Sequence, residues 1–112
     1  MENKPLINIV GVQVRPEDEE KWNKWHEEVH VPLLFKFKGL LEVTRNKVVT
    51  ESGEYPKYIT IYRFESQEAY KAYKNSPEVA AARDELGETW KEGKKYGVVW
   101  SVQYETMKTF KR

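Results

Sequence analysis

The stretch that decides the fold is Trp22-Asn23-Lys24-Trp25-His26-Glu27-Glu28-Val29-His30-Val31-Pro32-Leu33-Leu34. At 3.6 residues per turn its apolar side chains share one stripe and its charged side chains point elsewhere. The residues of the stripe are Trp22, Trp25, Val29 and Leu33. We therefore predict an amphipathic helix that packs this stripe on the core.

The two histidines of the chain, His26 and His30, are four residues apart, so their rings should lie side by side at the edge of the stripe. Pro32 lacks an amide hydrogen and crowds the carbonyl group of Glu28, so the helix should kink or loosen beside them. Imidazole titrates near neutral pH, which makes the pair a candidate for acid-base chemistry. The alternative is that both rings only donate hydrogen bonds to structural acceptors.

Strand patterns flank this helix. Residues 6–14 (Leu-Ile-Asn-Ile-Val-Gly-Val-Gln-Val) are rich in β-branched side chains, and 58–64 (Tyr-Ile-Thr-Ile-Tyr-Arg-Phe) pair naturally as a hairpin with 40–49. In 40–49, simple alternation places Leu41, Val43, Arg45, Lys47 and Val49 on one face. A last strand is predicted over 98–105. Asn8 is a polar residue within the first strand, and either it ties the sheet to a helix or it faces a cleft.

A second helical region follows the hairpin. Ser66 and Ser76 are placed to cap two helical segments, and Pro77 follows Ser76 at a first helical position. Gly87 is expected to end or bend the second segment. Residues 91–95 are predicted to form a solvated loop.

The composition limits the classes of function. Nineteen basic and eighteen acidic residues give a net charge of +1, so no overall field favours nucleic acid or a membrane surface. The absence of cysteine excludes disulfides and thiolate chemistry. No signal or membrane segment is recognised, which predicts a cytoplasmic protein. The length fits one domain over 1–112, with a core of about 6–105.

The element order is βαββαβ, which predicts an α+β, ferredoxin-like fold with a four-stranded antiparallel sheet and both helices on one face. The strands carry apolar residues on both faces, so the uncovered face needs a partner. A second copy of the same sheet is the simplest candidate, and a homodimer through the sheet faces is predicted.

Several motifs together resemble the dimeric α+β barrel superfamily. They are Trp22-x-x-Trp25-His26-x-x-x-His30-Val31-Pro32-Leu33-Leu34, Lys38-Gly39-Leu40 with Arg45 beyond it, Phe64-x-Ser66-x-Glu68-Ala69-Tyr70, and Ser76-Pro77-Glu78. The chain is most similar to EthD-like and related uncharacterised families. The resemblance implies two sheets facing each other across a dimer, with a ligand cleft between sheet and helices in each subunit.

Within that resemblance, His30-Val31-Pro32-Leu33 matches the His-x-Pro-Leu element that ends the first helix of EthD-like proteins. Haem-degrading members use a histidine on the second helix, and this chain has none after residue 30. The resemblance therefore favours His30 as the functional histidine and disfavours haem degradation of that type.

The remaining candidates are aromatic residues and one arginine. Trp22 or Trp25 would floor a pocket, and Tyr58, Tyr62 or Arg45 would orient an oxyanion. Trp100 presents a further ring from the last strand, although packing is the alternative for each aromatic residue. For Arg45 the alternatives are a salt bridge between subunits and an exposed head group.

These features predict a protein that binds a small apolar or aromatic molecule. His30, aided by His26, would act as acid or base in isomerase, cyclase or cofactor-free oxygenase chemistry, and a histidine pKa near neutrality is expected. A non-catalytic, stress-related or ligand-binding homodimer is the alternative, and whether the chain is an enzyme stays open. No cofactor or metal motif is present, because two histidines lack a third ligand and no glycine-rich phosphate loop occurs.

Overall fold

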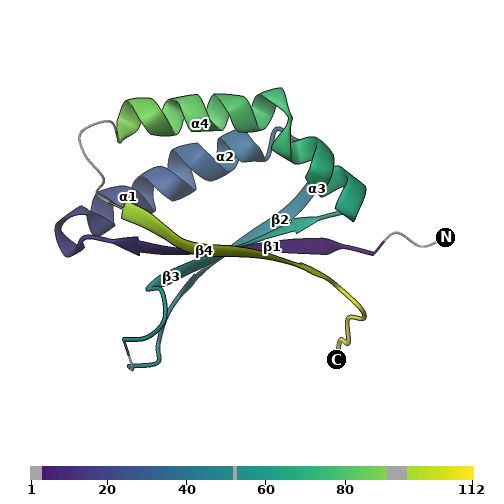
Figure 1. Cartoon of the computed structure of the whole chain (residues 1–112), viewed down its shortest axis with the longest axis horizontal. Helices are drawn as coiled ribbons and strands as arrows, with labels where there is room; N and C mark the ends of the chain where they lie inside the picture. The colour runs from purple at the N-terminus through teal and green to yellow at the C-terminus, as the bar shows by residue number, and fades with distance from the viewer. Residues whose placement is uncertain (1–3, 52, 91–95) are drawn as a thin grey trace.

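The protein folds as a four-stranded antiparallel sheet with its helices on one face (Figure 1). We describe a computed structural model, which covers residues 4–51, 53–90 and 96–112; the predicted loop at 91–95 lies outside them. The strands are β1 (Leu6–Val14), β2 (Leu40–Lys47), β3 (Tyr58–Phe64) and β4 (Tyr96–Glu105), in the spatial order β2-β3-β1-β4. This confirms the ferredoxin-like α+β prediction. Of the described residues, no helix is long and apolar enough to cross a membrane.

The first helical region changes geometry along its length. A 3-10 turn (Pro16–Asp18) leads into α1 (Glu19–Trp25), then a π-helical turn (His26–His30), then α2 (Val31–Leu34). The amide of Val31 donates to the carbonyl of His26, five residues back. Pro32 has no amide hydrogen to continue α-type bonding, and the wider turn accommodates it. The predicted loosening beside the histidines is confirmed.

The second helical region has the predicted caps. The Ser66 hydroxyl accepts from the amide of Ala69 at the start of α3 (Gln67–Lys74). Ser76 does the same for Val79 at the start of α4 (Pro77–Thr89). Gly87 does not end α4, because the helix runs on to Thr89. Buried Trp90 closes it, its amide donating to the carbonyl of Leu86 at 2.9 Å.

A β-bulge places Leu40, rather than Leu41, on the face of β2 that carries Val43 and Arg45. Leu40 pairs with Phe64, and the next residue of β3, Arg63, pairs with Glu42. Leu41 is therefore an extra residue without a partner on β3. Leu40 and Val43 therefore share the face that packs under the helices, and Leu41 is exposed. The prediction that Leu41 shares a face with Val43 and Arg45 was wrong, because alternation holds only without a bulge.

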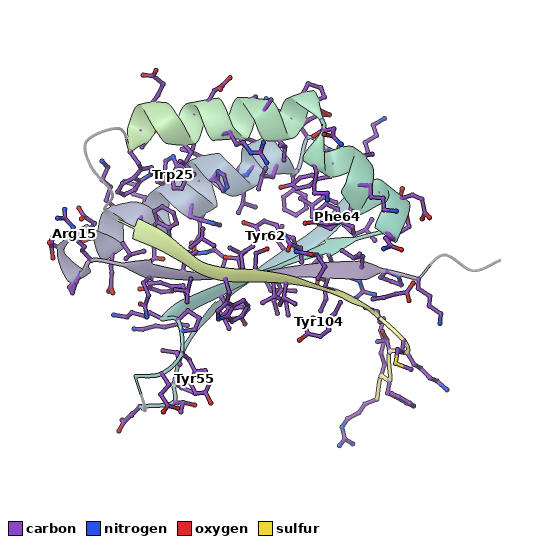
Figure 2. The ribbon with its side chains drawn as sticks, in the orientation of Figure 1. Arg15, Trp25, Tyr55, Tyr62, Phe64 and Tyr104 are labelled. Atoms are coloured by element: carbon purple, nitrogen blue, oxygen red, sulfur yellow. The ribbon has the colours of Figure 1, made fainter. Side chains whose placement is uncertain are left out.

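The core lies between helices and sheet in two clusters (Figure 2). One surrounds Phe64, and the other contains Trp22, Trp25 and Trp90. Val10, on β1, contacts both clusters and lies at the boundary between them. The opposite face of the sheet carries mostly apolar side chains that no helix covers; they are Ile7, Ile9, Ile59, Ile61, Trp100, Val102 and Tyr104.

Candidate functional site

The π-helical turn places the two imidazole rings beside the aromatic core. The ring centroids of His26 and His30 are 5.1 Å apart. The ring of His30 stacks on Trp25, with centroids 4.8 Å apart and planes inclined by 27°. Stacking restricts the ring orientation of His30, so the local helix geometry and the tryptophan together position this histidine.

Trp25 is itself fixed to α4. Its indole Nε1 donates to Glu85 Oε1 at 2.8 Å, and the hydroxyl of Thr89 donates to Glu85 Oε2. Both oxygens of this carboxylate are therefore engaged. The same carboxylate is close enough to His30 to favour its charged form, although burial acts more strongly and lowers the pKa of His30 below its usual 6.5.

His30 is a neutral ring at neutral pH with unused hydrogen-bonding capacity. Its Nδ1 is buried and has no hydrogen-bond partner within the described part of the chain. A neutral imidazole with a free nitrogen can accept a proton or a hydrogen bond from a bound molecule.

A cleft of about 380 Å³ lies at His30, between β1, β4 and the helices. Its wall is mostly apolar, and neutral polar groups from Asn8, Tyr62 and Ser101 line it too. Burial raises the pKa of Tyr62 to about 12, against the opposing effects of Arg45 and Thr60, so the phenol keeps its proton. Apolar walls with a few polar groups are typical of small-molecule sites of this size.

Asn8 belongs to this cleft and is held in place by β4. Its Oδ1 accepts from Gln103 Nε2 at 2.9 Å and from Ser101 Oγ at 3.2 Å. Of the two interpretations open for Asn8, facing a cleft is the one the structure selects. Its hydrogen bonds run to the neighbouring strand rather than to a helix.

His26 is more buried than His30 and lies near Arg45. Burial, then the guanidinium of Arg45, then His30 lower the pKa of His26 from 6.5 to about 3. Its Nδ1 is also buried without a hydrogen-bond partner in the described residues. The expectation of a histidine pKa near neutrality is therefore wrong for His26, because the low-dielectric surroundings disfavour the imidazolium.

Arg45 connects β2 to the first helical region. Its Nη1 donates to Glu27 Oε2 at 2.8 Å and its Nη2 to Asn23 Oδ1 at 2.9 Å. Asn23 in turn donates to the hydroxyl of Tyr58 at 3.2 Å. These residues line a second hollow of about 270 Å³, in which Arg45 already pairs with a carboxylate. This salt bridge joins two elements of one chain.

The structure brings only some of the predicted residues together. His30 and Tyr62 line the same cleft, and His26 lies directly behind His30. Trp22 and Trp25 are buried in the core and do not line this cleft, so the expected tryptophan floor is absent. Tyr58 and Arg45 line the second hollow, and Trp100 pairs with Gly11 on the uncovered face of the sheet.

Sequence reasoning missed four residues near His30. Glu85 and Ser101 were not singled out, and the cations Lys74 and Arg83 line the cleft from α3 and α4. The available signal for Glu85 was its place on the α4 stripe beside Ala82 and Leu86, but a polar residue there is informative only once the helix packing is known. Of the described residues, no group of three His, Asp or Glu is arranged to hold a metal ion.

The chain has the ferredoxin-like α+β fold of the proteins in the dimeric α+β barrel superfamily. The chain belongs to the DUF4286 family, a domain of unknown function, whose model matches residues 6–95. No curated protein matches the sequence. The prediction of this superfamily, with an EthD-like or related uncharacterised family, is confirmed.

Three solved structures illustrate the similarity. A mutant of MhuD with two manganese protoporphyrin IX molecules bound per active site has a TM-score of 0.71 and 18% identity, covering 96% of this chain and 99% of that one. An EthD family protein from Bacillus halodurans has a TM-score of 0.64 and 15% identity, covering 91% and 99%. A Dabb family protein with a ferredoxin-like fold from Mesorhizobium loti has a TM-score of 0.61 and 14% identity, covering 96% and 100%. At these identities the similarity shows the fold alone.

Proposed function

We propose that the cleft beside His30 binds a small, largely apolar or aromatic molecule, and that His30 accepts a proton from it. The observation that supports this is a half-buried, neutral imidazole at the cleft wall, whose buried Nδ1 has no hydrogen-bond partner in the described residues. An uncompensated polar nitrogen costs folding free energy, and a bound ligand is one way to satisfy it.

The other groups in the cleft suggest the class of ligand. Tyr62 keeps its proton and can donate to an oxygen, while Asn8 and Ser101 add neutral polar contacts. The charged side chains of the lining, Lys74 and Arg83, are both cationic. A compound with an apolar skeleton and an acidic or carboxylate oxygen fits this pattern. The flat porphyrin bound by the similar MhuD structure shows that this fold accommodates aromatic ligands.

The proposed chemistry is removal of a proton from a carbon or phenol of this ligand, with the negative charge stabilised by the Tyr62 hydroxyl. Isomerisation, cyclisation and cofactor-free oxygenation each begin with such a step. His26, with its pKa near 3, is unsuited to take the proton and serves as a neutral support for His30. The second candidate function is ligand binding without conversion, in which His30 only accepts a hydrogen bond.

Ligand binding through His30 is testable by thermal shift. We expect a panel of phenols, quinones, lactones and aromatic acids, each acid paired with its methyl ester, to contain compounds that raise the unfolding midpoint. For such a compound His30→Ala should weaken binding by about tenfold and lower any turnover by about a hundredfold or more. The matched control is Glu28→Ala, which changes an exposed residue of the same turn.

Three outcomes separate the possibilities. Equal affinity and turnover in wild type and His30→Ala would contradict the proposed role of His30. Retained binding by His30→Gln with no turnover of any bound compound in wild type would favour the non-catalytic function. A preference for the acids over their esters that disappears in Arg83→Ala would support the proposed ligand class.

We also propose that two copies pair through the uncovered sheet face. Its central side chains, Ile9 and Ile61, are neighbours on adjacent strands and alternate with Val10 and Tyr62, which pack in the core beneath the helices. A contiguous apolar surface of this kind favours association. Light scattering at micromolar concentration should give about twice the chain mass of 13.3 kDa. Ile61→Asp should shift the mass to the monomer, while Phe35→Asp, on an exposed residue after α2, should not; a monomeric wild type would refute the pairing.

A further inference from the structure

A hollow of about 350 Å³ lies beside the loop that joins β2 and β3, away from the His30 cleft. Its apolar lining comes from Val48, Tyr55, Pro56, Ile59 and Trp100. Tyr55 projects on the side of the sheet opposite to the helices (Figure 2). The hollow therefore opens on the face that the proposed homodimer would cover.

The hollow is built into the fold by a close approach across the sheet. Pro56 is buried and sits over Gly11 of β1, where an added Cβ atom would come within 2.8 Å of the proline ring and 3.2 Å of the Trp100 side chain. Only glycine leaves room for this contact. The loop is thus seated on the sheet, and the hollow does not depend on a ligand to hold its walls.

The segment 106–112, which follows β4, carries exposed apolar side chains on the same side of the sheet. Met107 is 87% exposed and Phe110 is 82% exposed. The amide of Thr106 donates to the carbonyl of Pro5 at 2.8 Å, and beyond that bond the segment departs from the sheet. Figure 1 shows the β2–β3 loop and this segment projecting at opposite ends of the molecule, so a chain does not place its own segment in its own hollow.

A two-fold axis can bring the two features together between copies. When two uncovered faces meet about a two-fold axis that crosses the strands, the two sheets run in opposite directions. The end of one sheet that carries the β2–β3 loop then lies against the end of the other sheet that carries the 106–112 segment. The β2–β3 loop of each copy then lies beside the 106–112 segment of its partner. Such an interface is isologous, since the same contact occurs twice.

The tip of the β2–β3 loop is acidic and the 106–112 segment is basic. The tip carries Glu51 and Glu54, Lys47 lines the hollow from the end of β2, and the segment carries Lys108, Lys111 and Arg112. Complementary charges at the edge of an interface select the partner and its orientation, while an apolar group at the centre supplies most of the affinity.

We propose that in the homodimer the 106–112 segment of each copy docks in the β2–β3 hollow of the other copy. Phe110 is the apolar anchor beside Tyr55 and Trp100, and the basic side chains meet Glu51 and Glu54. This inference rests on the homodimer proposed above but names a contact outside the central sheet interface.

The absence of native cysteine permits a direct test by disulfide trapping. Full-length Tyr55→Cys and Phe110→Cys proteins are mixed, allowed to exchange subunits and oxidised. We expect a covalent dimer whose digest contains a peptide pair joining position 55 to position 110. The control mixture of Phe35→Cys with Phe110→Cys should give no such pair, because residue 35 lies on the helical side.

A second measurement separates this inference from the dimer itself. Phe110→Ala should raise the dissociation constant of the dimer by about tenfold or more, as expected for an aromatic anchor, without changing the unfolding of the monomer. A dimer with no 55–110 linkage and an unchanged dissociation constant would overturn the docking and leave the sheet pairing standing. A monomeric wild type, or a 55–110 linkage within one chain of the double variant, would overturn the docking as well.

Discussion

Lowering the pH from about 7 to about 4 is expected to remove roughly 3 kcal/mol of the free energy of unfolding through His26 alone. The pKa of His26 is 6.5 as a free side chain and about 3 in the fold. Between these values the unfolded chain binds a proton that the folded chain does not, at about 1.4 kcal/mol for each pH unit. The stabilisation is complete above the unfolded pKa, is lost as the pH falls, and levels off near the folded pKa.

The measurement is urea unfolding at several pH values for wild type and His26→Gln. The variant removes the titrating ring, so its free energy of unfolding should fall less steeply with pH between about 6 and about 4. Lys24→Gln is the matched control, because it changes an exposed cation one residue before Trp25. Parallel curves for wild type and His26→Gln would show that His26 is not held neutral by the fold.

Phe64→Ala is expected to lower the free energy of unfolding by about 3–5 kcal/mol. The Phe64 side chain is 0% exposed, on β3 beneath α3, with ring centroids 4.7 Å from Tyr73 and 5.2 Å from Tyr70. Truncation loses the burial of an aromatic ring and leaves a cavity where strand and helix meet. A loss of this size is a large fraction of the total free energy of unfolding of a small domain.

Denaturant midpoints of Phe64→Ala and Phe35→Ala compare a buried and an exposed phenylalanine. Phe35 is 43% exposed just after α2, so its truncation should cost no more than about 1 kcal/mol. Similar losses in the two variants would mean that the cluster around Phe64 is not the main core.

Features governed by neighbouring residues were predictable from the sequence. The bounds of β1 and β3 follow from runs of β-branched and aromatic residues, and the caps at Ser66 and Ser76 act on amides three residues away. The loosened turn follows from Pro32, which lacks an amide hydrogen wherever the chain places it.

The membership of the candidate site was only partly predictable. His30 and Tyr62 were identified and line one cleft. Asn8 was noticed but its partners, Ser101 and Gln103, lie 93 and 95 residues further along the chain. Sequence spacing carries no information on such contacts, because they depend on which strands become neighbours and in which register.

The sequence by itself determined the order of the elements, their capping, and the placement of two imidazoles beside a tryptophan stripe, since all of these depend on interactions within about one helical turn. Only the tertiary structure decided that a bulge at Leu41 turns Val43 and Arg45 beneath the helices, and that Trp100 faces away from them. It also decided the low pKa of His26, which depends on burial and on the approach of Arg45 from another element. Register, burial and electrostatic surroundings are properties of the packed chain, so they arise only when distant segments meet.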